Sequence, residues 1–388
     1  MNPIKAKKLT ELIFYLVIIF DFITKIIIIY DFDVFQRYSF IPKAIIYISL
    51  FTFLISKFSG KKLIYIVIFF CLLIISFTCF LILFKSTPIE DIKLQLYLQL
   101  LYSYVFILGT FYAVINKEFK TAIVSGLKKG VINVGLINSV VIIIALLTKL
   151  ELFKSYPFSD RFGFNGIFLK TSEASYFYIL VISLLFFEFK NNKHNKNNKY
   201  LLVLFLIVSP LLGTKIIWLF LFLFFSLQFK KTAIAMTTLL TLSYIAFKDK
   251  MNLFLIAILP YGLELNDQRG MLTVLTSTRD LLLKNTLKFI NQNWEFYNYL
   301  FGGNRYKSLK VELEIFDLFS VFGIVGLLFF IYYLKKRIFN KLLNHQKGIL
   351  LIIITCVFVA GNFFKSFMCI SLLFLIVEYS IIGNNKLD

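Results

Sequence analysis

Apolar runs fill most of this chain, and short lysine-rich connections separate them. Many of the runs approach the roughly 20 residues that an α-helix needs to cross a hydrocarbon core about 30 Å thick. Reading the runs in order predicts about 12 transmembrane helices in a single integral-membrane domain over residues 1–388. They lie at 12–30, 42–58, 63–84, 94–115, 131–149, 172–189, 200–213, 216–229, 232–247, 315–334, 349–363 and 366–382. The pattern therefore predicts an all-α polytopic membrane protein.

The runs at 200–213 and 216–229 are short, and they meet at Pro210, Gly213 and Lys215. Backbone freed by such a break is tolerated at membrane depth only where protein or water covers it. We therefore expect either two short spans or a broken, re-entrant pair at this point.

Composition supports a membrane protein and changes the meaning of the charge. Hydrophobic residues make up 59% of the chain, which includes 48 Phe. The mean hydropathy is +0.82. These values exclude an ordinary soluble domain. In a soluble protein a net charge of +21 would indicate a nucleic-acid partner, but no nucleic-acid-binding module is visible here. Lysines instead collect in cytoplasmic loops and fix the orientation of a membrane protein.

The distribution of basic residues predicts the topology. With the N-terminus inside, every second loop is cytoplasmic, and these loops carry the lysine clusters. Both termini are then cytoplasmic, and no cleavable signal peptide is visible. Two longer segments fall outside: the loop at 149–171, and a large loop at 248–312 between the ninth and tenth helices.

The outer segments contain three arginines that orientation does not require, Arg161, Arg279 and Arg305. A guanidinium group binds phosphate or pyrophosphate through two parallel hydrogen bonds and stays charged at any relevant pH. The alternatives are contacts with lipid headgroups and structural ion pairs. Ser277 and Asp280 form a variant of the capping box, which predicts a helix from Arg279 to about Ile290.

Acidic residues follow where the chain enters and leaves the membrane. Glu312, Glu314 and Asp317 lie at the end of the large loop, and Glu173 lies at the outer end of the sixth helix. Partial burial raises the pKa of a carboxylate and suits it to general-base catalysis. Ion pairs with Lys307 and Lys310, or a charge in the first helical turn, are the structural alternatives.

Two lysines at outer membrane edges, Lys215 and Lys365, are candidates to line a cavity for an anionic substrate. Snorkelling of the ammonium group to the interface is the alternative. Asp31 and Asp33 form a DxD motif in the first outer loop, which some transferases use to hold a metal. The four cysteines and two histidines lack metal-site spacing, so we predict neither a metal nor a cofactor.

The chain resembles the bacterial O-antigen and capsular polysaccharide polymerases of the Wzy type, within the O-antigen ligase/polymerase superfamily. The resemblance covers the whole architecture, and four segments carry it in order. They are Arg161-Phe162-Gly163-Phe164 before Glu173-Ala174-Ser175, Leu212-Gly213-Thr214-Lys215, Ser277-Thr278-Arg279 with Phe301-Gly302-Gly303, and Glu312-Leu313-Glu314-Ile315-Phe316-Asp317-Leu318 with Phe322-Gly323-Ile324-Val325-Gly326.

The resemblance implies a bundle like that of GT-C glycosyltransferases in the bacterial cytoplasmic membrane. It implies metal-independent glycosyl transfer on the outer face, for O-antigen (lipopolysaccharide), capsule or exopolysaccharide synthesis. The donor and the acceptor would be oligosaccharides linked to undecaprenyl pyrophosphate. Arg161, Arg279 and Arg305 would hold the pyrophosphates, and Glu312 or Glu314 would orient or deprotonate the acceptor hydroxyl. A chain-length regulator and a flippase are the partners that such a role suggests.

Two departures from the family pattern bear on whether the chain resembles the polymerases or the ligases. The ligases use an outer-loop histidine, and none falls on an outer loop here, which favours a polymerase over a ligase. The Arg followed eleven residues later by Gly, known from some polymerases, is missing at all three arginines. Three alternatives stay open: a ligase-type transferase, a metal-dependent transferase that uses Asp31 and Asp33, and a flippase for lipid-linked oligosaccharides.

Overall fold

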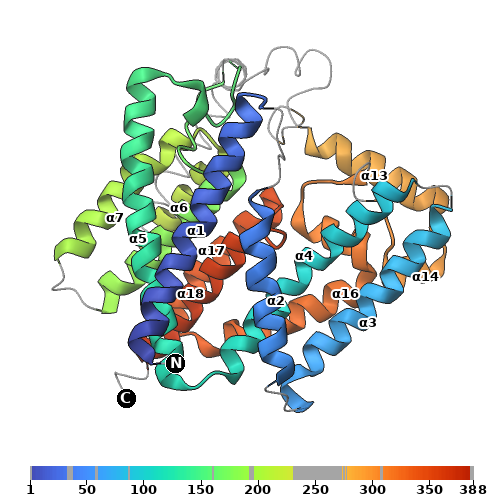
Figure 1. Ribbon diagram of the computed structural model, residues 1–388. Helices are drawn as coiled ribbons and strands as arrows, with labels where there is room; N and C mark the ends of the chain where they lie inside the picture. Colours follow the sequence, from blue (N-terminus) through green and yellow to red (C-terminus); the bar gives the residue numbers. More distant parts are fainter. Residues whose placement is uncertain are drawn as a thin grey trace.

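The computed structural model describes residues 2–32, 38–56, 60–85, 88–159, 161–191, 196–229, 273, 276, 278–305 and 309–384. These residues form a bundle of α-helices (Figure 1). The helices are α1 (Pro3–Ile29), α2 (Phe40–Ser56), α3 (Gly60–Leu83), α4 (Ile89–Val114), α5 (Lys117–Thr148), α6 (Thr171–Asn191), α7 (Lys196–Val208), α8 (Lys215–Gln228), α13 (Arg279–Asn293), α14 (Phe296–Phe301), α16 (Glu314–Arg337), α17 (Asn344–Ala360) and α18 (Phe367–Asn384). Three short 3-10 helices lie between them: η1 (Glu151–Phe153), η2 (Ser209–Leu212) and η3 (Phe339–Lys341).

Six helices of the described part, α1, α3, α4, α5, α6 and α16, are long and apolar enough to cross a membrane. Helices α2, α7, α8, α17 and α18 are apolar but shorter. Eleven of the twelve predicted helices overlap with these elements, and the remaining one, the ninth at 232–247, lies outside the described residues. The all-α fold and the apolar helices are therefore confirmed.

The bundle is apolar on its outside as well as in its core. Large side chains such as Ile23 on α1, Ile74 on α3 and Leu147 on α5 are exposed. Helices α6 and α18 pack against each other near the centre, and most of their residues are buried. An apolar exterior around an equally apolar core is the arrangement of a protein embedded in lipid.

The predicted break between the seventh and eighth helices is present. Helix α7 continues into η2, Gly213 adopts a left-handed conformation with φ +69°, and α8 follows at Lys215. The loop between α5 and α6, which is predicted to lie outside, satisfies the carbonyl groups that the break frees. The Phe164 amide donates to the Leu211 carbonyl at 2.9 Å, and the Ser155 hydroxyl donates to the Leu212 carbonyl at 2.9 Å. Protein thus covers the freed backbone.

A second break, which the hydrophobic pattern did not predict, interrupts α16 at Gly323, where φ is +65° and ψ is −171°. The amides of Gly303 and Asn304 donate to the carbonyls of Val321 and Ser320 at 3.1 and 3.0 Å. The Val321 carbonyl also accepts a short hydrogen bond from a hydroxyl on α3, that of Ser76. The break therefore fixes the segment after α14 against α16 and α3.

Side-chain contacts divide the charged groups between two ends of the bundle. At one end Arg337 of α16 donates to Glu378 of α18 at 2.6 Å and to the Gly109 carbonyl of α4 at 2.9 Å. Lys120 of α5 lies 3.2 Å from the same carboxylate. The start of α1 and the end of α18 point towards one end of the molecule (Figure 1). The start of α5 and the end of α16, both predicted to border inner connections, thus lie close to the end of α18.

Candidate functional site

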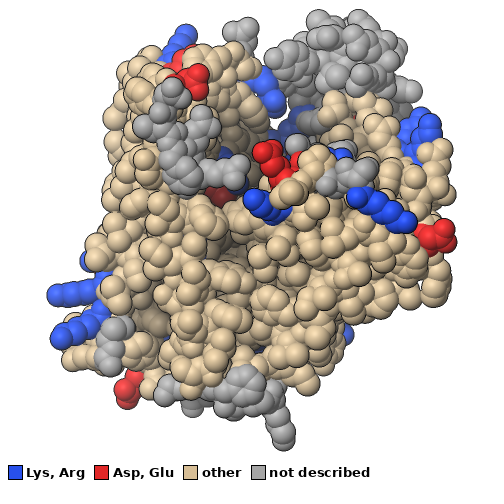
Figure 2. All heavy atoms as spheres, turned by 45° about the vertical axis from the view of Figure 1, so that its right-hand side comes forward, with Lys and Arg blue, Asp and Glu red and all other residues tan. Residues whose placement is uncertain are grey.

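Charged side chains gather around a hollow in the upper part of one face, and the surface below it is largely uncharged (Figure 2). Contacts between segments that the sequence predicts to lie outside define this end of the bundle. The loop between α5 and α6 contacts the α7–α8 break, and the start of α16 contacts the connection between α17 and α18. Segments that are far apart in the sequence therefore contribute to one polar region.

Three of the predicted cationic residues belong to this region. The Arg161 guanidinium stacks on the Tyr156 ring, 3.7 Å from its centroid. The positive charges of Arg161 and Arg279 both act on the ammonium group of Lys215. The Nε atoms of both arginines are shielded from solvent and make no hydrogen bond. We call Arg161, Lys215 and Arg279 the cationic cluster. Like charges held together in this way favour an anionic ligand.

Local backbone geometry positions this cluster. Gly163 and Gly213 bring the outer loop and the helix break into close backbone contact, and both have positive φ. A Cβ on Gly163 would lie 2.4 Å from the Leu212 carbonyl oxygen, so an alanine would separate the two segments. Arg161 and Lys215 each lie two residues from one of these glycines. The sequence therefore needs glycine at both positions to hold the two cations together.

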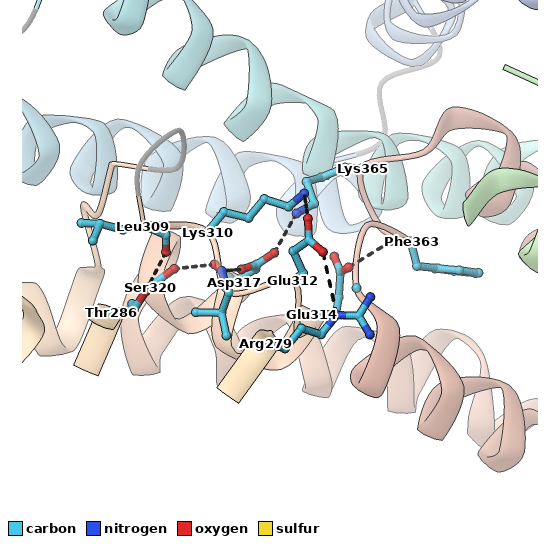
Figure 3. A network of polar contacts seen from close by, with 12 residues as sticks. Arg279, Thr286, Leu309, Lys310, Glu312, Glu314, Asp317, Ser320, Phe363 and Lys365 are labelled. Carbon is cyan, nitrogen blue, oxygen red and sulfur yellow. Dashed lines mark hydrogen bonds and ion pairs between the residues drawn. The ribbon is translucent and has the colours of Figure 1, made fainter. Parts of the chain in front are cut away.

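Glu312 is the carboxylate that faces Arg279 of the cationic cluster (Figure 3). Its Oε1 accepts a hydrogen bond from Lys310 Nζ at 2.7 Å, and its Oε2 lies 3.8 Å from Arg279 Nε. The Glu312 side chain is 37% exposed. Its backbone is left-handed, with φ +64°, a conformation that a residue with a side chain rarely adopts. Strain of this kind persists where the surrounding structure enforces it, and it is frequent at functional sites.

The charges around Glu312 reverse the pKa shift expected for it. Burial alone would raise the pKa of Glu312, as the sequence argument assumed. The hydrogen bond from Lys310, with the charges of Lys310, Arg279 and Lys365, instead holds that pKa below its usual value of 4.5. The carboxylate is therefore ionised at neutral pH, and it can orient a hydroxyl group or accept a proton from it.

Glu314 and Asp317, the other two acidic residues predicted at the end of the large loop, are buried in structural contacts (Figure 3). Glu314 is fully buried, and its Oε2 accepts from the Phe363 amide at 3.0 Å. Asp317 is also fully buried and accepts from the Val311 amide at 2.9 Å. Its second oxygen lies 3.0 Å from Lys365 Nζ. These contacts fix the connection between α17 and α18 against the start of α16.

Lys365, within this connection, and Glu173, in the first turn of α6, are both predicted site residues, and both have buried side chains. The Lys365 side chain is only 6% exposed, because it pairs with Asp317 and lies over the Tyr102 ring. Glu173 is 5% exposed and accepts a hydrogen bond from the Ser366 hydroxyl at 3.0 Å. Both residues face the protein interior in this structure.

Arg305, the third predicted arginine, takes a different partner from Arg279. Its guanidinium forms a short ion pair with Asp91 at the start of α4. The sequence argument did not single out Asp91. Its signal was the polar series Asp91, Gln95 and Gln99, which recurs every four residues on an otherwise apolar helix and is buried.

The described residues include only part of two further predictions, the capping box of α13 and the DxD motif. The predicted cap of α13 depends on Ser277, which lies outside the described residues. Its second member, Asp280, accepts hydrogen bonds from the hydroxyls of Thr273 and Thr276 at 2.6 and 2.7 Å. Asp31 follows α1, and Asp33 lies outside the described residues. Within the described ranges, no group of three or more His, Cys, Asp or Glu side chains is placed to hold a metal ion.

Comparison of the chain with protein-family models, with curated proteins and with solved structures gives no match.

Proposed function

We propose that the protein is a polysaccharide polymerase that joins oligosaccharide repeat units carried on undecaprenyl pyrophosphate, at the outer face of the bacterial cytoplasmic membrane. One observation supports this most: Arg279 of the cationic cluster lies 3.8 Å from the exposed, ionised carboxylate of Glu312, at one end of an apolar helical bundle. A substrate that suits this arrangement has an anionic head and a hydrocarbon tail.

In the proposed reaction, the cationic cluster holds the pyrophosphate of the donor. The bond between the anomeric carbon and the pyrophosphate oxygen breaks, and a hydroxyl of the acceptor sugar forms the new glycosidic bond. Arg161 and Arg279 stabilise the negative charge that grows on the leaving pyrophosphate, and such preorganised charges supply much of the catalysis in group transfer. Glu312 orients the acceptor hydroxyl and takes up its proton.

Glu314, Asp317, Glu173 and Lys365 then act as positioning residues rather than catalytic ones. Their contacts fix the connection at 361–366 beside Glu312. Arg305 is too firmly paired with Asp91 to hold a phosphate in the same arrangement, so its place in the site would require that pair to open.

A flippase for lipid-linked oligosaccharides is the second candidate, and the break in α16 favours it. Broken helices line the binding sites of many transporters. Here, however, Gly303, Asn304 and Ser76 already bond the carbonyls near Gly323. Because these carbonyls already accept hydrogen bonds from the protein, the break more plainly anchors neighbouring segments than binds a substrate. The polymerase is therefore the better proposal.

Deletion of the gene in the producing cell separates the candidates. The surface polysaccharide is compared on a gel after complementation with wild type, Arg279→Ala or Lys129→Ala. Lys129 is the control because it is an exposed cation that pairs with Glu11. The polymerase proposal expects single-repeat glycans in the deletion strain and with Arg279→Ala, and long chains with wild type and with Lys129→Ala.

Other outcomes contradict the proposal in distinct ways. Loss of long chains without any surface single repeat indicates a block at translocation and supports the flippase. Long chains that are made but not attached to their final acceptor indicate a ligase. Full-length polymer with Arg279→Ala removes the assigned role of the cluster.

A further inference from the structure

Helix α8 presents one exposed face that begins at Lys215 and is otherwise aromatic. Its exposed side chains Trp218, Phe222 and Phe225 are 58%, 46% and 44% exposed. With Lys215 they recur every three or four residues, so they share one side of the helix. The opposite side, which includes Ile217 and Phe220, is buried in the core. We call Trp218, Phe222 and Phe225 the aromatic stripe.

The aromatic stripe differs from the exposed faces of α1, α3 and α5, whereas α4 and α16 expose Tyr97 and Tyr332, respectively. In the described residues, the large exposed hydrophobic side chains of α1, α3 and α5 are all Ile, Leu or Val. These helices need only contact bulk lipid, for which aliphatic side chains suffice. Aromatic rings instead offer broad, rigid contact surfaces that single out specific partners. The stripe therefore indicates a specific hydrocarbon ligand.

The charges at the head of α8 indicate how such a ligand would lie. Lys215 is at the first position of α8, two residues after Gly213, whose backbone contacts the loop segment that contains Arg161. A ligand with a phosphate in the cationic cluster would have its hydrocarbon chain next to the aromatic stripe. From Lys215 to Phe225 the helix rises by about 15 Å, which suits an extended chain rather than a compact group.

We propose that the aromatic stripe binds the polyisoprenyl chain of the lipid-linked substrate while Lys215 contacts its phosphate. This inference rests on the proposed function for the identity of the lipid. It assigns α8 a role of its own: the helix aligns the lipid so that the pyrophosphate reaches Arg161 and Arg279.

A binding experiment on the purified full-length protein in nanodiscs tests the proposal. The probe is undecaprenyl phosphate with a photoreactive group near the start of its chain, and the labelled peptide is identified by mass spectrometry. The variant replaces Trp218, Phe222 and Phe225 together by Leu, which keeps α8 apolar. The control is Tyr332→Leu, which removes an exposed aromatic side chain from α16.

The proposal expects labelling of α8 in wild type and Tyr332→Leu, with unlabelled undecaprenyl phosphate as an effective competitor. It expects at least about tenfold weaker labelling in the triple Leu variant, because three aromatic contacts are lost. Equal labelling of the triple variant, or labelling confined to other helices, overturns the proposal. Equal competition by phosphatidylglycerol also overturns it, since the stripe would then bind ordinary lipid.

Failure of this inference is distinguishable from failure of the proposed function. The Leu variants are also introduced into the deletion strain. Stripe-dependent labelling without any polymer-forming activity of the wild type would leave the lipid site standing and remove the polymerase. If wild type forms normal polymer but the triple Leu variant is labelled as strongly as wild type, the polymerase proposal stands and the lipid site on α8 is rejected.

Discussion

Two charged clusters, one at each end of the described bundle, show how differently a membrane protein uses ionised side chains. At one end Arg337 and Glu378 are 9% and 0% exposed, and a backbone carbonyl and Lys120 complete their contacts. At the other end Arg279 and Glu312 are 26% and 37% exposed and are 3.8 Å apart. The first cluster is closed on itself and links α4, α5, α16 and α18. The second retains access and excess positive charge, as a binding site requires.

The largest expected effect is a difference in folding stability between a variant of the first cluster and a variant of the second. Arg337→Ala leaves the Glu378 carboxylate without its closest partner in a buried site, and breaking such a pair costs about 3–5 kcal/mol. We expect little folded protein after purification in detergent, measured by thermal melting and gel filtration. Arg279→Ala should melt nearly as wild type does, because the side chain is partly exposed. A stable Arg337→Ala protein would contradict the structural role of the closed cluster.

The second effect concerns activity rather than folding. Removal of one preorganised group that stabilises transition-state charge lowers a rate by about 10²- to 10³-fold. We expect that loss in polymer formation by Arg279→Ala, measured with purified protein and lipid-linked repeat units. Arg279→Lys should recover only part of it, since lysine lacks the planar fork. Full activity of either variant would contradict the role of Arg279.

The third effect tests the glycine contact that positions Arg161. Gly163→Ala places a Cβ 2.4 Å from a backbone oxygen at a positive φ, so the outer loop must move. We expect about tenfold lower activity. The control is Gly348→Ala, whose Cβ would meet only the Leu227 side chain at 3.3 Å. Similar activities of the two variants would show that the loop position does not matter.

The smallest effect is a shift in pH dependence. Because the folded-state pKa of Glu312 is lowered, its ionised form persists to a lower pH than that of an ordinary glutamate. Lys310→Ala removes the hydrogen bond that contributes most to this lowering. We therefore expect the acidic limb of the pH–activity profile to move to higher pH in that variant. The comparison is Lys154→Ala, which removes a pair with Glu151 instead. An unmoved limb would exclude Glu312 as the group that titrates.

The helices could be predicted from the sequence because each apolar run is a local signal. The break at Gly213 was also visible, since Pro210 and Gly213 interrupt the pattern within a few residues. The break at Gly323 was not, because Asn304 and Ser76, distant in sequence, stabilise it. Short-range patterns predict elements, and long-range contacts decide where they bend.

The candidate site was only partly predictable for the same reason. The sequence identified the charged residues, yet it did not show which carboxylate is accessible. The backbone of residues 361–366 decides that, because it and its side chains occupy Glu314 and Asp317 and leave Glu312 exposed. The pairing of Arg305 with Asp91 across 214 residues likewise has no local signal.

The central claim is that the accessible cluster binds the phosphate end of a lipid-linked substrate. Its most direct test is the affinity of purified protein for undecaprenyl pyrophosphate, measured in nanodiscs for wild type, Arg279→Ala and Lys129→Ala. Our account predicts equal affinity for wild type and Lys129→Ala and at least about tenfold weaker binding for Arg279→Ala, since a charged hydrogen bond is lost. Equal binding by all three proteins would contradict it.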